Sequence, residues 1–202
     1  MNKKIFCIGF NKTGTSSLHQ YFINSHLSSI HNMKWAHLSN NASDNDLINY
    51  INKFDCLCDG EQPDFIRLNT LYPNSNFILT IRPMKSWLES RIKWILKIYP
   101  KKRKNGLMDN EFFKHPENAI KKWINDRNTY HKHVMKYFKN KNNLLVIDLT
   151  LDKNWNKTIG NFCNISNYST KKFHNNKNLL QNISKEHQFI INKYILLIDV
   201  CL

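Results

Sequence analysis

Residues 4–18 read KIFCIGFNKTGTSSL, and this stretch decides how the rest of the chain is interpreted. Its apolar run IFCI predicts a buried strand, and a helical pattern begins at Leu18. Gly9 and Gly14 bracket the turn between them, where glycine lets the backbone close around an anion without a Cβ clash. Unpaired N–H groups and the positive dipole end at a helix start favour the same ligand. The stretch therefore predicts a phosphate or sulfate site.

The position of the lysine separates this turn from the common nucleoside triphosphate loop. That loop reads G-x-x-x-x-G-K-[ST], with lysine directly after the second glycine. Here Thr15 follows Gly14, and Lys12 precedes it by two residues, which places the amine on the other side of a bound group. The alternative is an ordinary helix start, capped by Thr15 or Ser16 with Lys12 in solvent. We favour the anion site because the strand and both glycines fit it too.

A second segment repeats the pattern of a strand that ends in a cation. Residues 76–83 read NFILTIRP, an apolar strand that ends at Arg82, and WLESR then enters a helix and places Ser90 eight residues after that arginine. The planar guanidinium suits a phosphate dianion, and a serine hydroxyl adds a further donor. The alternative is that Arg82 pairs with a local carboxylate and Ser90 faces solvent.

These two segments resemble a known family, the sulfotransferases that use 3′-phosphoadenosine 5′-phosphosulfate (PAPS). The run KTGTS at 12–16 is similar to their 5′-phosphosulfate loop, and Arg82 and Ser90 have the spacing of their 3′-phosphate site. A strand followed by Trp155 and the segment FHNN at 173–176 also look like family features, although the usual prolines of the latter are missing. The resemblance implies a P-loop NTPase-like sulfotransferase fold, PAPS as donor and no metal.

The resemblance also implies roles for individual residues. Lys12 and the loop N–H groups would stabilise charge on the leaving phosphate oxygen while a sulfuryl group moves to a hydroxyl or amine acceptor, a glycan being one option. The acceptor itself is left open, and the loops at about 28–43 and 99–115 are expected to shape its pocket. The residues expected to hold the donor are Asn11, Lys12, Thr13, Gly14, Thr15, Ser16, Arg82 and Ser90.

An acceptor hydroxyl needs a general base. Asp59 is our first candidate because the family often carries an acidic residue at this strand end, and Glu61 is the second, in the segment DGEQP at 59–63. Histidine serves in other family members, which keeps His31 and His37 as further candidates. The alternative interpretations are a turn carboxylate for Asp59 and surface residues for the two histidines.

Composition limits the class of protein. A chain of 202 residues fits a single domain over 1–202, and its net charge of +15 spreads along the sequence with one dense run at 101–104. We interpret these charges as solvated lysines, since no nucleic-acid-binding module is recognisable and a specific nucleic-acid partner is not expected. The sequence leaves the oligomeric state open.

Cysteine usage and hydropathy bear on the compartment. The five cysteines are an odd number, and Cys7 and Cys163 lie in apolar runs, as buried free thiols do. Cys56 and Cys58 are too close in sequence for a usual zinc pair. No signal peptide or membrane-spanning stretch is recognisable, so we expect a reduced, cytoplasmic setting without a metal.

Apolar strands alternate with helical patterns along the chain, which predicts an α/β/α fold with a central parallel sheet. Lys12, Asp59 and Arg82 each follow a strand and should meet at the carboxyl edge of that sheet. We predict a polar loop at 28–43 and a basic loop at 100–106. Strands are expected at 4–8, 55–58, 77–81 and 144–148, and helices at 16–27, 44–53, 64–71, 85–98, from 116, 155–163 and 184–200.

Two rival functions fit part of the pattern. A P-loop kinase or hydrolase would use Asp148, at the end of an apolar strand, to hold magnesium. The position of Lys12 argues against this enzyme. A non-catalytic anion binder that keeps the fold is the second rival.

Overall fold

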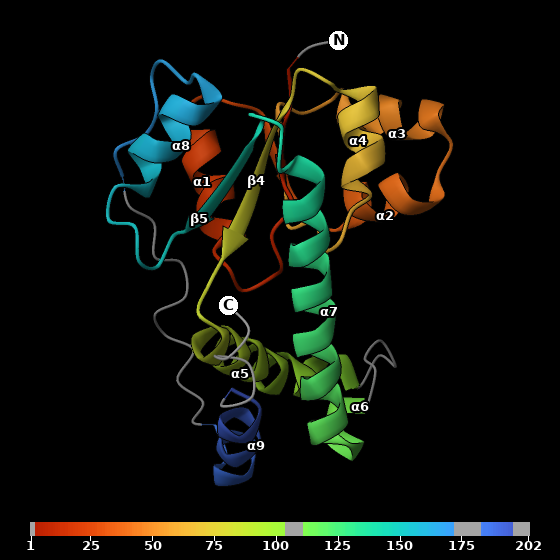
Figure 1. The fold of residues 1–202 in the computed structure, drawn as a ribbon, viewed down its shortest axis with the longest axis vertical. Helices are drawn as coiled ribbons and strands as arrows, with labels where there is room; N and C mark the ends of the chain where they lie inside the picture. Colours follow the sequence, from red (N-terminus) through yellow and green to blue (C-terminus); the bar gives the residue numbers. More distant parts are fainter. Residues whose placement is uncertain (1–2, 104–110, 172–182, 196–202) are drawn as a thin grey trace. The chain divides into compact units, whose positions relative to one another are not determined.

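The computed structural model describes residues 3–103, 111–171 and 183–195. Within them five strands form one parallel sheet in the order β2-β3-β1-β4-β5 (Figure 1). Because every pairing is parallel, all carboxyl ends lie along one edge, as predicted. The strands are β1 (Ile5–Cys7), β2 (Ser29–His31), β3 (Cys56–Cys58), β4 (Asn76–Ile81) and β5 (Leu144–Asp148).

Helices connect the strands, as the crossover connections of a parallel sheet require. The helices of the described residues are α1 (Thr15–Asn24), α2 (Lys34–Asn41), α3 (Asp44–Ile51), α4 (Phe65–Leu71), α5 (Met84–Arg103), α6 (Glu111–Lys114), α7 (Pro116–Phe138), α8 (Trp155–Cys163) and α9 (Lys185–Ile195).

The sheet has a packed layer on each face, which gives the predicted α/β/α fold (Figure 1). Alternate residues of β1 supply the two layers, since successive strand side chains point to opposite faces. Ile5 and Cys7 join a buried cluster with Tyr21 of α1 and Trp155 of α8. On the other face Phe6 packs against Trp35 of α2, Tyr72 after α4 and Phe77 of β4, with ring centroids 5.2–6.0 Å apart.

The chain divides into two compact units. One, which we call the sheet unit, contains Met1–Arg82 and Lys132–Asn175, and the other, the helical unit, contains Pro83–His131 and Asn176–Leu202. Helix α7 runs through the boundary. The expectation of a single domain over 1–202 stays a prediction.

The helical unit is held by arginines stacked on aromatic rings. Arg91 lies with its guanidinium carbon 4.8 Å from the ring centroid of Trp123, and Arg127 lies 4.9 Å from that of Trp87. Trp123 also stacks on Phe112 of α6, 5.4 Å away. Such cation–π contacts are strongest where the pair is shielded from water, and Arg127 is only 6% exposed.

The prediction of two loops was wrong. Residues 28–43 contain β2 and α2 in place of a polar loop, and the expected basic loop begins inside α5, which continues to Arg103. The short helix α6 was not predicted. The last helix is described to Ile195, and the basic residue Lys104, the segment at 173–176 and Cys201 lie outside the described residues.

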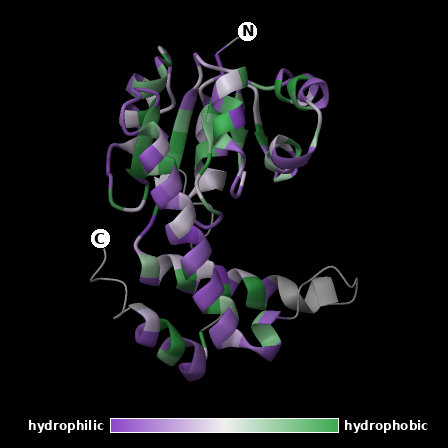
Figure 2. Cartoon of the chain, turned by 45° about the vertical axis from the view of Figure 1, so that its right-hand side comes forward, coloured by the Kyte–Doolittle hydropathy of each residue, from purple (hydrophilic) through white to green (hydrophobic). Residues whose placement is uncertain are grey.

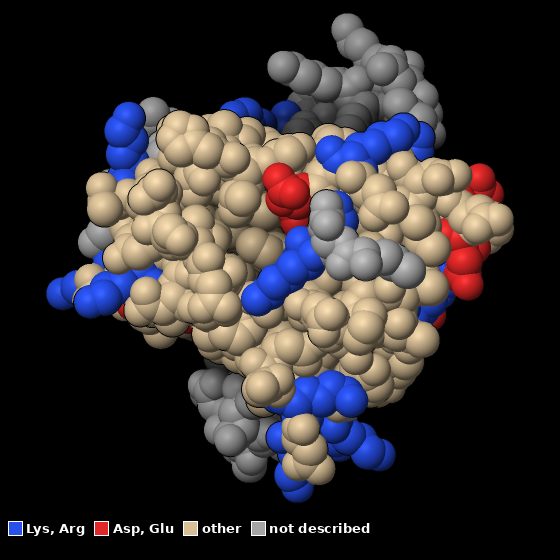
Figure 3. Space-filling view, turned by 90° about the horizontal axis from the view of Figure 1, so that it is seen from above, with Lys and Arg blue, Asp and Glu red and all other residues tan. Residues whose placement is uncertain are grey.

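Hydropathy follows the layers. Figure 2 shows hydrophobic strands in the sheet and helices that carry hydrophilic residues along part of their surface. In the described part of the chain no helix combines the length and the apolar character that crossing a membrane requires. On the face seen in Figure 3, Lys and Arg side chains lie in several separate places, which agrees with the interpretation of solvated lysines.

The described cysteines Cys7, Cys56, Cys58 and Cys163 are free and buried, as the sequence predicts for two of them. Burial raises the pKa of the Cys7 and Cys56 thiols well above the usual value and that of Cys163 to about 11. The thiols of Cys7, Cys56 and Cys163 are therefore protonated and poorly nucleophilic at neutral pH.

Candidate active site

The loop between β1 and α1 has the shape that an anion cradle needs. Gly14 adopts φ 104° and Lys12 adopts φ 66°, both in the left-handed region. A Cβ on Gly9 would lie 2.0 Å from Thr80 Oγ1, so only glycine allows the loop to pack this closely on β4. A non-glycine residue held at positive φ costs of order 1 kcal/mol or more, a strain that concentrates at functional sites.

Thr13 fixes the loop from inside. Its side chain is fully buried, and its hydroxyl oxygen lies 2.6 Å from Thr80 Oγ1 and also donates to the carbonyl of Phe10. The hydroxyl is thus used within the protein. Any contact of Thr13 with a ligand would come from its backbone.

Helix α1 begins without a capping side chain. Its N-cap is Gly14, whereas Ser43 caps α3 and Asp64 caps α4 by accepting a hydrogen bond from a first-turn N–H. This excludes the ordinary helix cap by Thr15 or Ser16 that we considered from the sequence. A helix start that no side chain caps offers its N–H groups and its positive dipole end to an anion.

The hydroxyls of Thr15 and Ser16 point instead toward a histidine. Thr15 Oγ1 and Ser16 Oγ each lie 3.2 Å from Nε2 of His31, at the end of β2. The sheet order brings this strand end to α1, because β2 pairs with β3 and β3 pairs with β1.

Asp59 belongs to the same cluster. It directly follows β3, adopts φ 64°, and accepts a hydrogen bond from Thr15 Oγ1 over 3.3 Å with Oδ1. Its Oδ2 lies 3.8 Å from Nδ1 of His31, and both side chains are 25% exposed. The carboxylate therefore contacts the start of α1 and the histidine at once.

Glu61 reaches the anion loop from the same segment as Asp59. Its Oε2 accepts a hydrogen bond of 2.8 Å from Nδ2 of Asn11. The bond joins the loop after β3 to the loop after β1.

Arg82 completes the carboxyl edge. Its Nη1 donates to the carbonyl oxygen of Lys12 over 3.1 Å, so the end of β4 lies against the anion loop, as the sequence predicts. Ser90 lies on α5, in the helical unit, and its pairing with Arg82 stays a prediction.

The turn that carries Asp59 is held by a tryptophan whose contact with this turn was not predicted. Trp35 of α2 is fully buried and donates from Nε1 to the carbonyl of Cys58 over 2.9 Å. A Cβ on Gly60 would lie 2.0 Å from the indole ring. The tryptophan and the glycine thereby fix the backbone on either side of Asp59.

Two further histidines differ in position. His19 is four residues after Thr15 on α1, and its ring centroid lies 5.5 Å from that of His31. Burial, together with the nearby His31, lowers the pKa of His19. This residue was missed, although its i,i+4 spacing from Thr15 places it on the same helix face. His37 is exposed on α2 and contacts Asn41.

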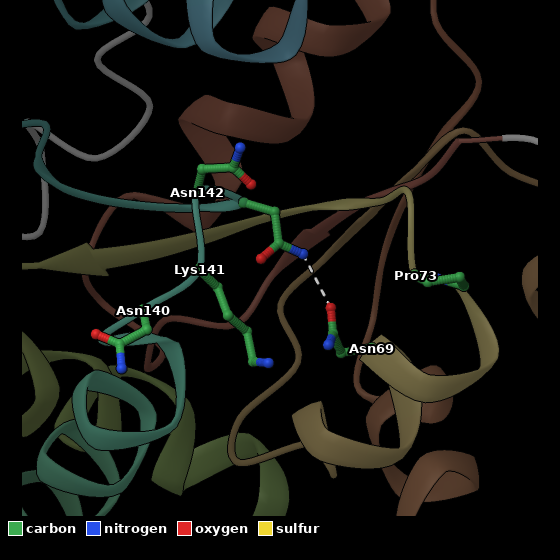
Figure 4. Close-up of a pocket in the computed structure, with 6 residues that line it drawn as sticks. Asn69, Pro73, Asn140, Lys141 and Asn142 are labelled. Atoms are coloured by element: carbon green, nitrogen blue, oxygen red, sulfur yellow. Dashed lines mark hydrogen bonds between the residues drawn. The ribbon is translucent and has the colours of Figure 1, made fainter.

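One hollow of the sheet unit lies away from these residues. It has a volume of about 680 Å³ and is lined by Asn69, Pro73 and residues 140–143, which precede β4 and β5 (Figure 4). It therefore opens at the amino ends of these strands, whereas the site residues follow carboxyl ends. Among the described residues no group of three or more His, Cys, Asp or Glu side chains could hold a metal ion.

Comparison with known proteins identifies the family to which the chain belongs. The profile of the sulfotransferase domain matches residues 4–188. The chain belongs to the sulfotransferase family. Its fold is similar to that of a sulfotransferase from Alicyclobacillus acidocaldarius, with a TM-score of 0.55 and 13% identity over 97% of this chain and 92% of the other. No curated protein matches the sequence of the present chain significantly.

Proposed function

We propose that this sulfotransferase takes a sulfuryl group from PAPS and transfers it to a hydroxyl or amine acceptor. One relationship carries the proposal: two groups suited to anions, the uncapped start of α1 and the guanidinium of Arg82, lie at the ends of the neighbouring strands β1 and β4. Two such groups at neighbouring strand ends suit a single donor with a charged group at each end.

The residues of the anion loop act on the 5′-phosphosulfate. The loop N–H groups and the hydroxyls of Thr15 and Ser16 hold the phosphate, and Lys12 stabilises the charge that grows on its leaving oxygen. Arg82 and Ser90 hold the 3′-phosphate and fix the position of the donor.

Transfer forms a bond between the acceptor atom and sulfur while the bond from sulfur to the 5′-phosphate oxygen breaks. The electron pair of the broken bond stays on that oxygen, next to Lys12. The proton of the acceptor passes to a carboxylate, Asp59 or Glu61.

A P-loop kinase or hydrolase is less favoured by the geometry. Its magnesium would need the carboxylate of Asp148, but Oδ1 of this residue accepts hydrogen bonds from the N–H and the hydroxyl of Thr150, over 2.7 and 2.6 Å. In addition, Lys12 precedes Gly14. In the triphosphate loop the lysine follows the corresponding glycine.

Thermal unfolding with three nucleotides tests the donor. We expect 3′,5′-adenosine bisphosphate to raise the melting temperature more than AMP or magnesium ATP does, since a ligand at 100 times its Kd stabilises by about 2.7 kcal/mol. The matched variant Arg82→Lys keeps the charge but loses the planar fork, so it should lose the preference for bisphosphate over AMP. Equal shifts for bisphosphate and AMP in the unaltered protein would contradict the proposal.

A further inference from the structure

One buried residue of β4 contacts the anion loop at two places. Thr80 is fully buried. Because β1 and β4 pair in register, with Cys7 opposite Ile78, the chain after β1 brings Gly9 against this residue. A Cβ on Gly9 would lie 2.0 Å from Thr80 Oγ1, and the same oxygen lies 2.6 Å from Oγ1 of Thr13. The start and the middle of the loop therefore converge on a single hydroxyl.

The direction of the hydrogen bond between the two threonines follows from their surroundings. Thr13 has one hydroxyl proton, and this proton goes to the carbonyl oxygen of Phe10, which can only accept. The proton between Thr13 and Thr80 must then come from Thr80. Two buried hydroxyls thus form a chain that begins on β4 and ends on the backbone of the loop. Removal of the first hydroxyl deprives the second of its donor, and buried polar groups are costly to leave without partners.

The end of β4 also holds the residue that precedes Thr13. Arg82 donates from Nη1 to the carbonyl oxygen of Lys12, 3.1 Å away. Lys12 has the left-handed φ of 66°, a conformation that persists only where the surrounding structure fixes it. Its backbone is held on one side through its own carbonyl and on the other through Thr13. Both bonds come from the same strand end.

We propose that Thr80 is a positioning residue of the donor site. Its hydroxyl holds Thr13, and with it Lys12, in the conformation that directs the loop N–H groups and the lysine amine to the 5′-phosphosulfate. The inference rests on the proposed function. It goes beyond packing, because valine has the same branched shape as threonine and suits a strand equally well. The hydroxyl is the part that the donor site requires.

Isothermal titration of the purified chain with 3′,5′-adenosine bisphosphate tests this role. We expect Thr80→Val to bind the bisphosphate about tenfold more weakly than the unaltered protein, because the loop loses one of its two anchors on β4. Thr80→Ser is the conservative variant. It keeps the hydroxyl that donates to Thr13 and should bind like the unaltered protein.

A second ligand separates positioning of the loop from a general loss of structure. Adenosine 3′-monophosphate lacks the 5′-phosphate that the loop is proposed to hold, so Thr80→Val and the unaltered protein should bind it equally well. A merely structural role of Thr80 would weaken both ligands alike.

Tyr72→Phe is the matched control variant. It also removes a hydroxyl from a buried core residue, but this hydroxyl donates to Asn52 Oδ1 over 3.2 Å, before the amino end of β3 and away from the loop. Tyr72→Phe should bind the bisphosphate like the unaltered protein. Urea unfolding records the stability that each variant loses, so that affinity and stability can be compared.

Two results overturn the role of Thr80. One is bisphosphate affinity that Thr80→Val retains in full, and the other is an equal loss for both ligands. If Thr80→Val does not fold, Thr13→Val breaks the same bond from the loop side, and full affinity of that variant overturns the inference. An unaltered protein that binds no bisphosphate contradicts the proposed donor instead, so the two failures can be told apart.

Discussion

Arg82 reaches back from the end of β4 and donates from Nη1 to the backbone oxygen of Lys12, 3.1 Å away. The side chain that we assign to one end of the donor therefore also braces the loop that we assign to the other end. A change at Arg82 should disturb both ends, which is why Arg82→Lys, with its charge retained, is preferable to an alanine variant.

The charge of Lys12 can be removed without changing its backbone. Asparagine tolerates the left-handed region better than other non-glycine residues, so Lys12→Asn should keep φ near 66°. We expect kcat for sulfuryl transfer to fall by about 10²-fold or more, with the free energy of unfolding changed by less than about 0.5 kcal/mol.

Steady-state rates with labelled PAPS, and urea unfolding, measure the two effects of Lys12→Asn. Lys34→Asn makes the same chemical change at an exposed position at the start of α2 and should leave kcat unaltered. Full turnover by Lys12→Asn would remove the lysine from the mechanism. A loss of affinity alone would favour the non-catalytic binder.

The two candidate bases can be distinguished by isosteric amides. Asp59→Asn and Glu61→Gln keep an oxygen that accepts from Thr15 and Asn11, but neither amide can take the acceptor proton. The variant that lacks the true base should have a kcat about 10²–10⁴-fold lower, with bisphosphate affinity unchanged.

Asp55→Asn is the control, because this carboxylate accepts from Ser28 N at the amino end of β3. If both Asp59→Asn and Glu61→Gln retain full kcat, neither carboxylate is the base.

The contact between Gly60 and Trp35 should be measurable as a coupling energy. An added Cβ would lie 2.0 Å from the indole, so Gly60→Ala should destabilise the protein by about 1–3 kcal/mol. Trp35→Phe makes room for a Cβ at position 60, but it loses the hydrogen bond to the Cys58 carbonyl and some buried apolar area. The double variant should be more stable than the sum of the single effects predicts, by about 1 kcal/mol in urea unfolding. Additive effects would show that the turn relaxes without the indole moving.

Stability should fall with acid because of His131. Burial and the nearby Arg127 lower the pKa of this histidine to about 4, below the ordinary value of 6.5. Between these values the unfolded chain binds the proton and the folded chain does not, so unfolding is favoured as pH falls. We expect about 1–3 kcal/mol of stability, present above pH 6.5, to be lost as pH approaches 4.

Urea unfolding at several pH values tests the role of His131. The variant His131→Gln should show a smaller loss over this range than the unaltered protein, while His37→Gln, at an exposed position, should lose as much as the unaltered protein does. An equal loss in His131→Gln would assign the acid sensitivity to other groups.

Sequence patterns predicted the sheet wherever a strand was a continuous apolar run. The runs before Gly9 and Arg82 identified β1 and β4, and the helix expected at 44–53 is α3. Strand β2 was missed because three half-buried residues carry no such pattern, and only their register against β3 makes them a strand.

The surroundings of His31 could not be predicted for a related reason. Its partners Thr15 and Asp59 lie far from it in sequence, and the strand order alone brings them together. Helix α2 did carry a signal: Trp35, Ala36 and Ser39 are buried at helical spacing, but the polar residues around them concealed it.

The left-handed backbone at Lys12 has a consequence for how this chain can evolve. Lysine and asparagine codons differ by one base, and both residues are abundant in this sequence. Drift from one to the other at position 12 meets no conformational barrier. Only selection for the amine would prevent this exchange. A relative that is equally rich in lysine and asparagine and carries asparagine at this position would therefore have kept the fold and lost the catalytic activity.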